Sequence, residues 1–325
     1  MTATSIVKKI ASASLLVTAL SVQSAFALTV SPAREELTGD KGETITKTFT
    51  VINEQDTDQV LYTSVEAFDA QGETGTPNFI QAQEGLSTWV TIAEKVVIKK
   101  GERLAVPYTV TIPQEAESGG HFAAIFLSTV PPSAEEGQVS VGSKIGMLIL
   151  LRVTGDIKES GGLSSFATKD GDKVFTSLPV DFVYKFNNTG NDRAKPEGSV
   201  VITNMFGGDV ANINANPSQG NVLPGSTRKF EFRLGDVDAP AVSAPFFDHV
   251  KFQMKHFALG MYTADLGLTF GNSGTANASL TYFIFPWHLI TVVLVAVLLV
   301  IVLLMILVKR YNRWIIKQAR AAAKE

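Results

Sequence analysis

Between its two ends the chain alternates apolar and polar residues with a period of two. In the clearest run the apolar positions are Val180, Phe182, Tyr184 and Phe186. Such alternation is typical of half-buried β-strands, which present one face to a core and the other to water. Similar runs recur at 44–51, 108–112, 230–234 and 250–254, and Gly-, Asn- or Pro-containing turns separate them. Short strands with regular turns predict β-sandwiches, and no long helical period interrupts residues 28–281.

Two apolar segments break this pattern. The run Leu289 to Val308 has Thr291 as its only polar residue. At about 1.5 Å per residue it reaches about 30 Å, the thickness of a bilayer core, so we predict a transmembrane helix that contacts the lipid bilayer from Leu289 to Val308. The N-terminal segment is shorter, follows two lysines and ends at Ala27 in a small-x-small triplet. That pattern predicts a secretory signal peptide with a small-x-small cleavage site, and leaves open whether cleavage follows Ala27.

Charge beside the apolar run predicts the orientation. The tail that follows Val308 is rich in Lys and Arg and has Glu325 as its single acid. Positive charge stays on the cytoplasmic side of a membrane, so we expect a single-pass protein with extracellular N-terminal domains and a cytoplasmic C-terminal tail. Aromatic residues that suit the two membrane interfaces flank the run, with Tyr282, Phe283, Phe285 and Trp287 before it and Tyr311 and Trp314 after it.

The exported region repeats itself weakly. A strand ending in Asn occurs at Asn53 and again at Asn187-Asn188, and a Gly-led turn enters a strand at Gly101 and Gly225. A third pattern of glycine, aromatic residue and alanine begins at Gly120 and at Gly260. Three landmarks in the same order predict two sandwich domains of one kind.

These observations predict an all-β protein with two immunoglobulin-like β-sandwich domains followed by one transmembrane α-helix. The Gly-rich stretch near Gly161-Gly162 marks the boundary between the domains. The expected division is a signal peptide at 1–27, a first sandwich at 28–156, a second at 157–281, a transmembrane helix at 282–308 and a basic tail at 309–325.

Composition narrows the class of partner. The chain has 325 residues, a formal net charge of −3 and no cysteine. Eight of its 28 Lys and Arg residues lie at the two ends, which leaves 20 basic residues against 30 acids in the exported region. An acidic surface argues against nucleic acid, whose phosphates need basic patches. Without cysteine the sandwiches must be stable through core packing alone, and a thiol nucleophile or thiolate metal site is excluded.

Residues able to support catalysis or metal binding are few. The four histidines, His121, His249, His256 and His288, match no metal-ligand spacing. If residues 250–254 form a strand, His249 and His256 fall on opposite faces. Asp236, Asp238 and Asp248 lack the pattern of a calcium loop, and a solvated acidic loop is the simpler interpretation. We therefore predict no enzyme activity, no cofactor and no catalytic or metal-binding residues.

Three further features have a functional and a structural interpretation. Trp89 is either a sugar-stacking platform or, more often in a sandwich, part of the core. Asn277-Ala278-Ser279 matches the glycosylation acceptor pattern, which is common by chance. The tail with Trp314, Ile315 and Ile316 is either a partner-binding helix or an amphipathic segment lying on anionic lipid.

Turns and strand ends at 28–32, 53, 112–122, 186–190 and 222–228 accompany this layout of signal peptide, two sandwiches, membrane helix and basic tail. With these residues the chain resembles the WxL-interacting-protein family of bacterial cell-surface proteins. The resemblance implies two immunoglobulin-like domains on a membrane anchor, the first associated with peptidoglycan and the second with a partner protein. The insert between Asp69 and Trp89 departs from that family, and the first domain also looks like the sandwiches of pilus chaperones.

We accordingly expect a non-enzymatic, membrane-anchored cell-surface binding protein that contacts a cell-wall polymer or another surface protein. The alternative is an accessory subunit of a membrane protein complex, although the apolar run contains no GxxxG motif for helix pairing. Exposed strand edges offer unpaired backbone groups to a partner strand. The sequence suggests Leu28–Leu37 and Val139–Val153 as candidate edges and identifies no individual ligand-binding residue.

Overall fold

The computed structural model describes residues 28–81, 84–131 and 144–322, with side chains up to residue 316. The predicted signal peptide, 1–27, lies outside these residues, as do the last three residues of the tail. The chain divides into two compact units. The first runs to Phe68 and includes Phe79–Glu117 and His121–Thr154; the second comprises Asp69–Asn78, Ser118–Gly120 and the chain from Gly155 onward.

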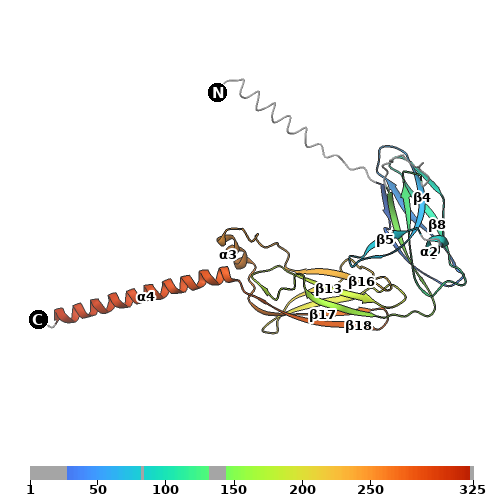
Figure 1. Ribbon diagram of the computed structural model, residues 1–325. Coiled ribbons are helices and arrows are strands. Elements are labelled where there is room, and N and C mark those ends of the chain that lie inside the picture. Colours follow the sequence, from blue (N-terminus) through green and yellow to red (C-terminus); the bar gives the residue numbers. More distant parts are fainter. Residues whose placement is uncertain (1–27, 82–83, 132–143, 323–325) are drawn as a thin grey trace, which may run out of the picture. The chain divides into compact units, whose positions relative to one another are not determined.

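The first sandwich packs a four-stranded sheet against a six-stranded one, and its core lies between them (Figure 1). The four-stranded sheet has the order β1 (Leu28–Ser31), β3 (Thr44–Asn53), β8 (Arg103–Thr111) and β6 (Val90–Ile92). The six-stranded sheet has the order β2 (Arg34–Gly39), β10 (Lys144–Val153), β9 (Gly119–Ser128), β4 (Gln59–Gln71) and β5 (Thr76–Ile80), with β7 (Lys95–Ile98) also on β4. The insert between Asp69 and Trp89 forms the end of β4, strand β5 and the short helix α2 (Leu86–Trp89).

The second sandwich packs a three-stranded sheet against a five-stranded one. The three-stranded sheet has the order β11 (Gly161–Thr168), β13 (Val180–Asn188) and β16 (Thr227–Leu234). The five-stranded sheet has the order β12 (Val174–Phe175), β18 (Gly274–Ile284), β17 (Gly260–Phe270), β14 (Glu197–Asn204) and β15 (Asp209–Asn214). Helix α3 (Phe246–Lys255) follows β16, and helix α4 (Trp287–Ala322) follows β18 (Figure 1).

The two sandwiches share one strand arrangement. In the first, β2 pairs in parallel with β10, the last strand of its sheet in sequence order. In the second, β12 pairs in parallel with β18, which is again the last strand. The central pairs also correspond, since β3 with β8 and β13 with β16 are antiparallel. The prediction of two immunoglobulin-like sandwiches in a mostly β protein is confirmed.

A buried asparagine performs the same task in each sandwich, and its hydrogen bonds explain the repeat in the sequence. The side chain of Asn53 donates to the carbonyls of Thr57 and Lys99, at 2.9 and 3.1 Å, and accepts from the amide of Gln55. The backbone of Asn53 pairs with the Gly-led turn at Gly101, whose amide donates to the Asn53 carbonyl at 2.9 Å. One buried amide thereby ties three chain segments together at the end of the strand.

Asn188 repeats these bonds in the second sandwich. Its side chain donates to the carbonyls of Asp192 and Val222, at 2.7 and 2.8 Å, and accepts from the amide of Gly190. The amide of Gly225 donates to the Asn188 carbonyl at 2.9 Å. Of the two asparagines that end the second strand, the equivalent of Asn53 is therefore Asn188 rather than Asn187.

The third landmark of the repeat is also shifted by one residue. Strands β9 and β17 begin at Gly119 and Gly260, and both glycines have a positive φ, +130° and +104°. Counted from these starts, Ala123 in β9 and Ala264 in β17 both point into a core. The predicted match of Gly120 with Gly260 puts corresponding residues on opposite faces, because side chains alternate along a strand.

The predicted alternation is confirmed for 180–186 and 230–234, whose apolar residues lie in the second core. It is wrong for 250–254, which belong to helix α3 rather than to a strand. Apolar residues at 246, 247, 250 and 254 also satisfy a helical period, so a short run of this kind fits both structures. With α3 in place, His249 and His256 cannot be assigned to two faces of a strand.

The end of the second sandwich extends further than predicted. Strand β18 continues to Ile284, so Tyr282, expected at the outer membrane interface, is 2% exposed in the core. Helix α4 begins at Trp287 and continues past Val308 to Ala322, which makes the predicted tail an extension of the same helix. One segment of α4, Trp287–Ile316, is long and apolar enough to cross a membrane, and an 18-residue window within it has a mean hydropathy of 3.6.

Two buried tyrosines of the second core differ in their hydroxyl groups. The hydroxyl of Tyr184 donates to the carbonyl of Ala215 at 3.0 Å, whereas that of Tyr282 is buried without a partner among the described residues. An unsatisfied buried hydroxyl costs about 1–3 kcal/mol. We expect Tyr184→Phe to lower the free energy of unfolding by about 1–2 kcal/mol and Tyr282→Phe to leave it unchanged or raise it. Urea denaturation of both variants tests this, and a larger loss for Tyr282→Phe would contradict it.

Candidate functional site

The histidines do not converge on one site. His121 packs against Trp89 with the rings tilted and their centroids 4.7 Å apart, and its Nε2 lies 2.9 Å from the carbonyl oxygen of Glu117. His249 on α3 stacks on His288 at the start of α4, at 4.4 Å. Trp89 itself is half-buried and packs against the first core, in agreement with its structural interpretation.

The acidic residues considered for calcium are also dispersed. Asp238 lies 2.6 Å from a guanidinium nitrogen of Arg233, which also pairs with Asp181. Asp248 lies in the first turn of α3. Among the described residues no group of three His, Asp or Glu side chains is placed to hold a metal ion. The acidic loop therefore has a partner within the protein.

Charged pairs cover the outer face of the three-stranded sheet. Glu231 on β16 lies 2.7 Å from Lys229 and 3.1 Å from Lys169. Hydrogen bonds from these two lysines, that from Lys229 first, hold the pKa of Glu231 below its usual value. Charges on an edge strand discourage pairing with another strand, which disfavours β16 as a site of strand addition.

The predicted edges are confirmed only in part. Residues 28–37 contain β1 and β2, and each ends its sheet. Residues 139–143 lie outside the described part, and β10, which fills the rest of the second candidate, lies between β2 and β9. Its residues Leu148–Val153 pair with β2. Most of that candidate edge is therefore already occupied by the protein's own strand.

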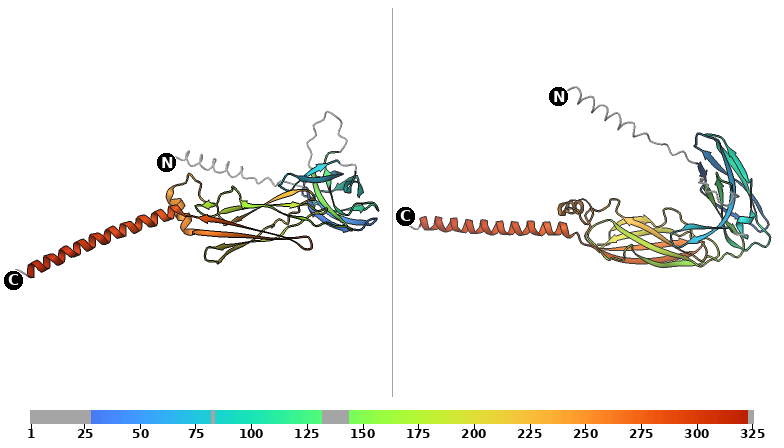
Figure 2. Two further views of the ribbon diagram at one scale, coloured as in Figure 1. Left: turned by 60° about the horizontal axis from the view of Figure 1, so that its bottom comes forward. Right: turned by 45° about the horizontal axis from the view of Figure 1, so that its top comes forward.

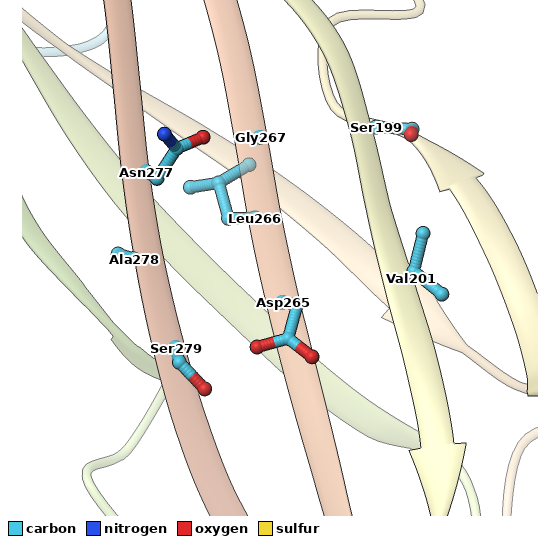
Figure 3. Close-up of a pocket in the computed structure, with 8 residues that line it drawn as sticks. All are labelled: Ser199, Val201, Asp265, Leu266, Gly267, Asn277, Ala278 and Ser279. Carbon is cyan, nitrogen blue, oxygen red and sulfur yellow. The ribbon is translucent and has the colours of Figure 1, made fainter. Parts of the chain in front are cut away.

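A hollow of about 570 Å³ lies on the outer face of the five-stranded sheet of the second sandwich. Figure 3 shows its residues standing on neighbouring strands: β14, β17 and β18. Its lining comprises Ser199, Val201, Asp265, Leu266, Gly267, Asn277, Ala278 and Ser279. The pairing register explains their proximity, because Gly267 lies between Ser199 and Asn277, and Asp265 lies between Val201 and Ser279.

Gly267 leaves the floor of this hollow open. It lies in the interior of β17, where a glycine costs about 0.5–1 kcal/mol relative to a residue with a side chain. Its backbone does not require glycine, since no positive φ is recorded for it, and an added Cβ meets only Asn277 Oδ1, at 3.5 Å. The fold therefore accepts a side chain at this position. Strand glycines of this kind often mark a place where a ligand or another backbone approaches closely.

The chemistry of the hollow suits hydrogen bonding. Ser199 and Ser279 offer hydroxyls, Asn277 an amide and Asp265 a carboxylate. Asp265 is the one acid in the lining, so the hollow contains no pair of titratable groups for acid–base catalysis. Asn277, the first residue of the glycosylation pattern, is exposed here. The sequence does not predict this site, because its residues become neighbours only through the pairing of three strands.

Comparison with protein-family models and with curated protein sequences gave no match. Among solved structures, this chain shows a distant similarity in fold to two-domain chaperones with PapD-like folds. The class 5 fimbriae chaperone CfaA is 12% identical with a TM-score of 0.38, over 79% of this chain and 99% of that chain. A chain of the CsuC–CsuE chaperone–tip adhesion subunit pre-assembly complex from archaic chaperone-usher Csu pili of Acinetobacter baumannii is 13% identical, with a TM-score of 0.34, over 63% and 89%.

A protein of unknown function from Porphyromonas gingivalis W83 is 11% identical, with a TM-score of 0.27, over 78% of this chain and 99% of that chain. Likeness at these values concerns the fold and assigns no family. The sandwiches described above suit a binding role, and the apolar helix α4 suits a membrane anchor.

Proposed function

We propose that this chain is a non-enzymatic, membrane-anchored cell-surface protein that binds an extended polar polymer across the hollow of its second sandwich. The observation that carries the proposal is Gly267, a strand glycine that the backbone does not need and that keeps the hollow open. The hydroxyl, amide and carboxylate groups of the lining suit a cell-wall polymer or an extended segment of another surface protein.

Helix α4 supports the anchoring half of the proposal. Its apolar side chains from Val293 to Val308 are exposed, as expected for a helix surrounded by lipid rather than by protein. The basic residues that follow Val308 support a cytoplasmic C-terminal end with the sandwiches outside. The single acid of the hollow supports binding rather than catalysis, since catalysis needs converging titratable groups.

Membership of the WxL-interacting-protein family is part of the proposal. It is supported by the layout of two sandwiches and one anchor, and by the turns at Asn53 and Asn188 that carry the resemblance. An accessory subunit of a membrane complex remains the second candidate. This second candidate is favoured by the packing of α3 against the start of α4, because that packing holds α4 in a defined orientation.

The test is to fill the hollow with Gly267→Phe in the full chain, solubilised and offered insoluble peptidoglycan or, separately, a membrane-protein extract. We expect a loss of capture with no loss of stability, because a side chain replaces a strand glycine. Gly162→Val on β11 is the matched control, since an added Cβ there meets nothing within 4 Å. Equal capture by the Gly267→Phe variant and the wild type would contradict the site. Loss with the control as well would show that the site is not specific.

A further inference from the structure

Large apolar side chains are exposed at one end of the second sandwich. We name six of them the apolar crown: Met205, Phe206, Met254, Phe257, Met261 and Phe283. Phe206 is 85% exposed, and each of the other five is at least 38% exposed. Soluble proteins rarely display such residues as a group, and their clustering indicates an interaction surface.

Strand register places the crown at the end of the sandwich from which α4 leaves. Met261 pairs with Phe283, one residue before the end of β18, and Asn204, which precedes Met205, pairs with Tyr262. An added Cβ at Gly260 would lie 2.6 Å from Met205, so Met205 covers the start of β17. Met205, Met261 and Phe283 therefore lie near the C-terminal end of β18, while Met254 lies on α3 and Phe257 lies between α3 and β17.

No flexible linker separates this end from α4. Only Phe285 and Pro286 lie between β18 and α4, a reach of about 7 Å at full extension. The link is also held, because the amide of Phe285 donates to the carbonyl of Phe175 at 2.7 Å. If α4 crosses a bilayer from Trp287, the end of the sandwich lies at the membrane surface.

Helix α3 fixes this arrangement from the side. The Gln253 side chain accepts a hydrogen bond from the amide of Leu289 at 3.0 Å and donates one to the carbonyl of Thr176 at 3.0 Å. His249 stacks on His288, and Phe246 packs against Trp287 at 5.9 Å. Figure 2 shows α3 beside the start of α4 in both views. The crown residues of α3 and of the strands are thus held in one body with the first turn of α4.

We propose that the apolar crown is an interfacial membrane contact, which seats the second sandwich on the bilayer that α4 spans. This rests on the proposed role of α4 as an anchor. The bilayer is the occupant because only Phe285 and Pro286 separate the end of β18, where crown residues lie, from the apolar helix α4. Aromatic and methionine side chains suit the boundary between headgroups and acyl chains, where an apolar body can be buried beside polar groups. Lys251 and Lys255 are exposed on α3 and can meet anionic headgroups.

The absence of native cysteine permits a clean test by single-cysteine nitroxide labelling of the full chain. The labelled variants are Phe206→Cys, Phe257→Cys and Met261→Cys, in nanodiscs that contain neutral and anionic phospholipids. Ser273→Cys, in the turn between β17 and β18, is the aqueous control, and Leu298→Cys in α4 is the control for the membrane interior. Far-UV circular dichroism checks each fold, and Met205→Cys replaces any crown variant that fails. The measurement is the ratio of label accessibility to oxygen over that to a water-soluble nickel complex.

We expect the three crown labels to show a ratio several-fold above that of Ser273→Cys, and to approach Leu298→Cys. Crown labels that match Ser273→Cys while Leu298→Cys lies in the bilayer would overturn the crown contact and leave the anchor intact. Crown labels shielded from both reagents would also overturn it, because they would indicate a protein partner or a second copy. An aqueous label at Leu298→Cys would refute the anchor on which the inference rests.

Discussion

Replacing Asn188 with alanine is expected to destabilise the second sandwich by about 2–4 kcal/mol, because several buried backbone groups lose a hydrogen bond together. Asn188 is 1% exposed, and its side chain forms hydrogen bonds with the backbone of Gly190, Asp192 and Val222. The carbonyl of Val222 keeps a second hydrogen bond, from the amide of Ala194. Water cannot readily replace the lost side-chain amide of Asn188 at this depth. A loss of this size is a large fraction of the stability of a single domain.

The neighbouring residue supplies the control. Asn187 lies on the opposite, half-buried face of β13, so Asn187→Ala is expected to change the free energy of unfolding by at most about 0.5 kcal/mol. Urea denaturation followed by circular dichroism measures both variants. An equal effect of the two substitutions would show that the buried amide does not stabilise the turn as described.

Ending the chain after Thr291 is expected to move the protein from the membrane fraction to the soluble fraction. The truncation removes the apolar turns of α4, in which each central Leu, Ile or Val favours insertion by about 0.3–0.6 kcal/mol. It keeps Trp287, His288 and Leu289, and with them the contacts to α3. The second sandwich therefore stays folded, and the expected change is one of location alone.

Carbonate-washed membranes and the soluble fraction are compared by immunoblotting. A chain that ends after Ile316 serves as the control, since it keeps the whole candidate span and loses only the residues beyond it. The control should remain in the membrane fraction. Retention of the shorter chain in washed membranes would mean that something other than α4 holds the protein there.

Much of the fold could be predicted from local patterns. Alternation over the seven residues 180–186 of β13 identifies a strand, because successive side chains of a strand point to opposite faces of the sheet. Helix α4 follows from length and composition alone. Helix α3 could not be predicted in this way, because a run of five alternating residues is too short to separate a strand from a helix.

The repeat was detected with errors of one residue at two landmarks. Letters alone cannot distinguish Asn187 from Asn188, and only burial and hydrogen bonding do so. The hollow was not predicted, since its lining comes from three strands. One signal was present in the sequence: between Leu266 and Leu268, both buried, Gly267 occupies an outward position where a strand usually carries a polar or β-branched side chain.

The central claim is that the two sandwiches stand outside the membrane on α4, and single-cysteine labelling of intact cells tests it most directly. Ser273→Cys reports the second sandwich and Ala321→Cys reports the end of α4, in a chain with no other cysteine. With a membrane-impermeant maleimide, we predict labelling of Ser273→Cys in intact cells and of Ala321→Cys only after permeabilisation. Labelling of Ala321→Cys in intact cells, with Ser273→Cys protected, would contradict the account.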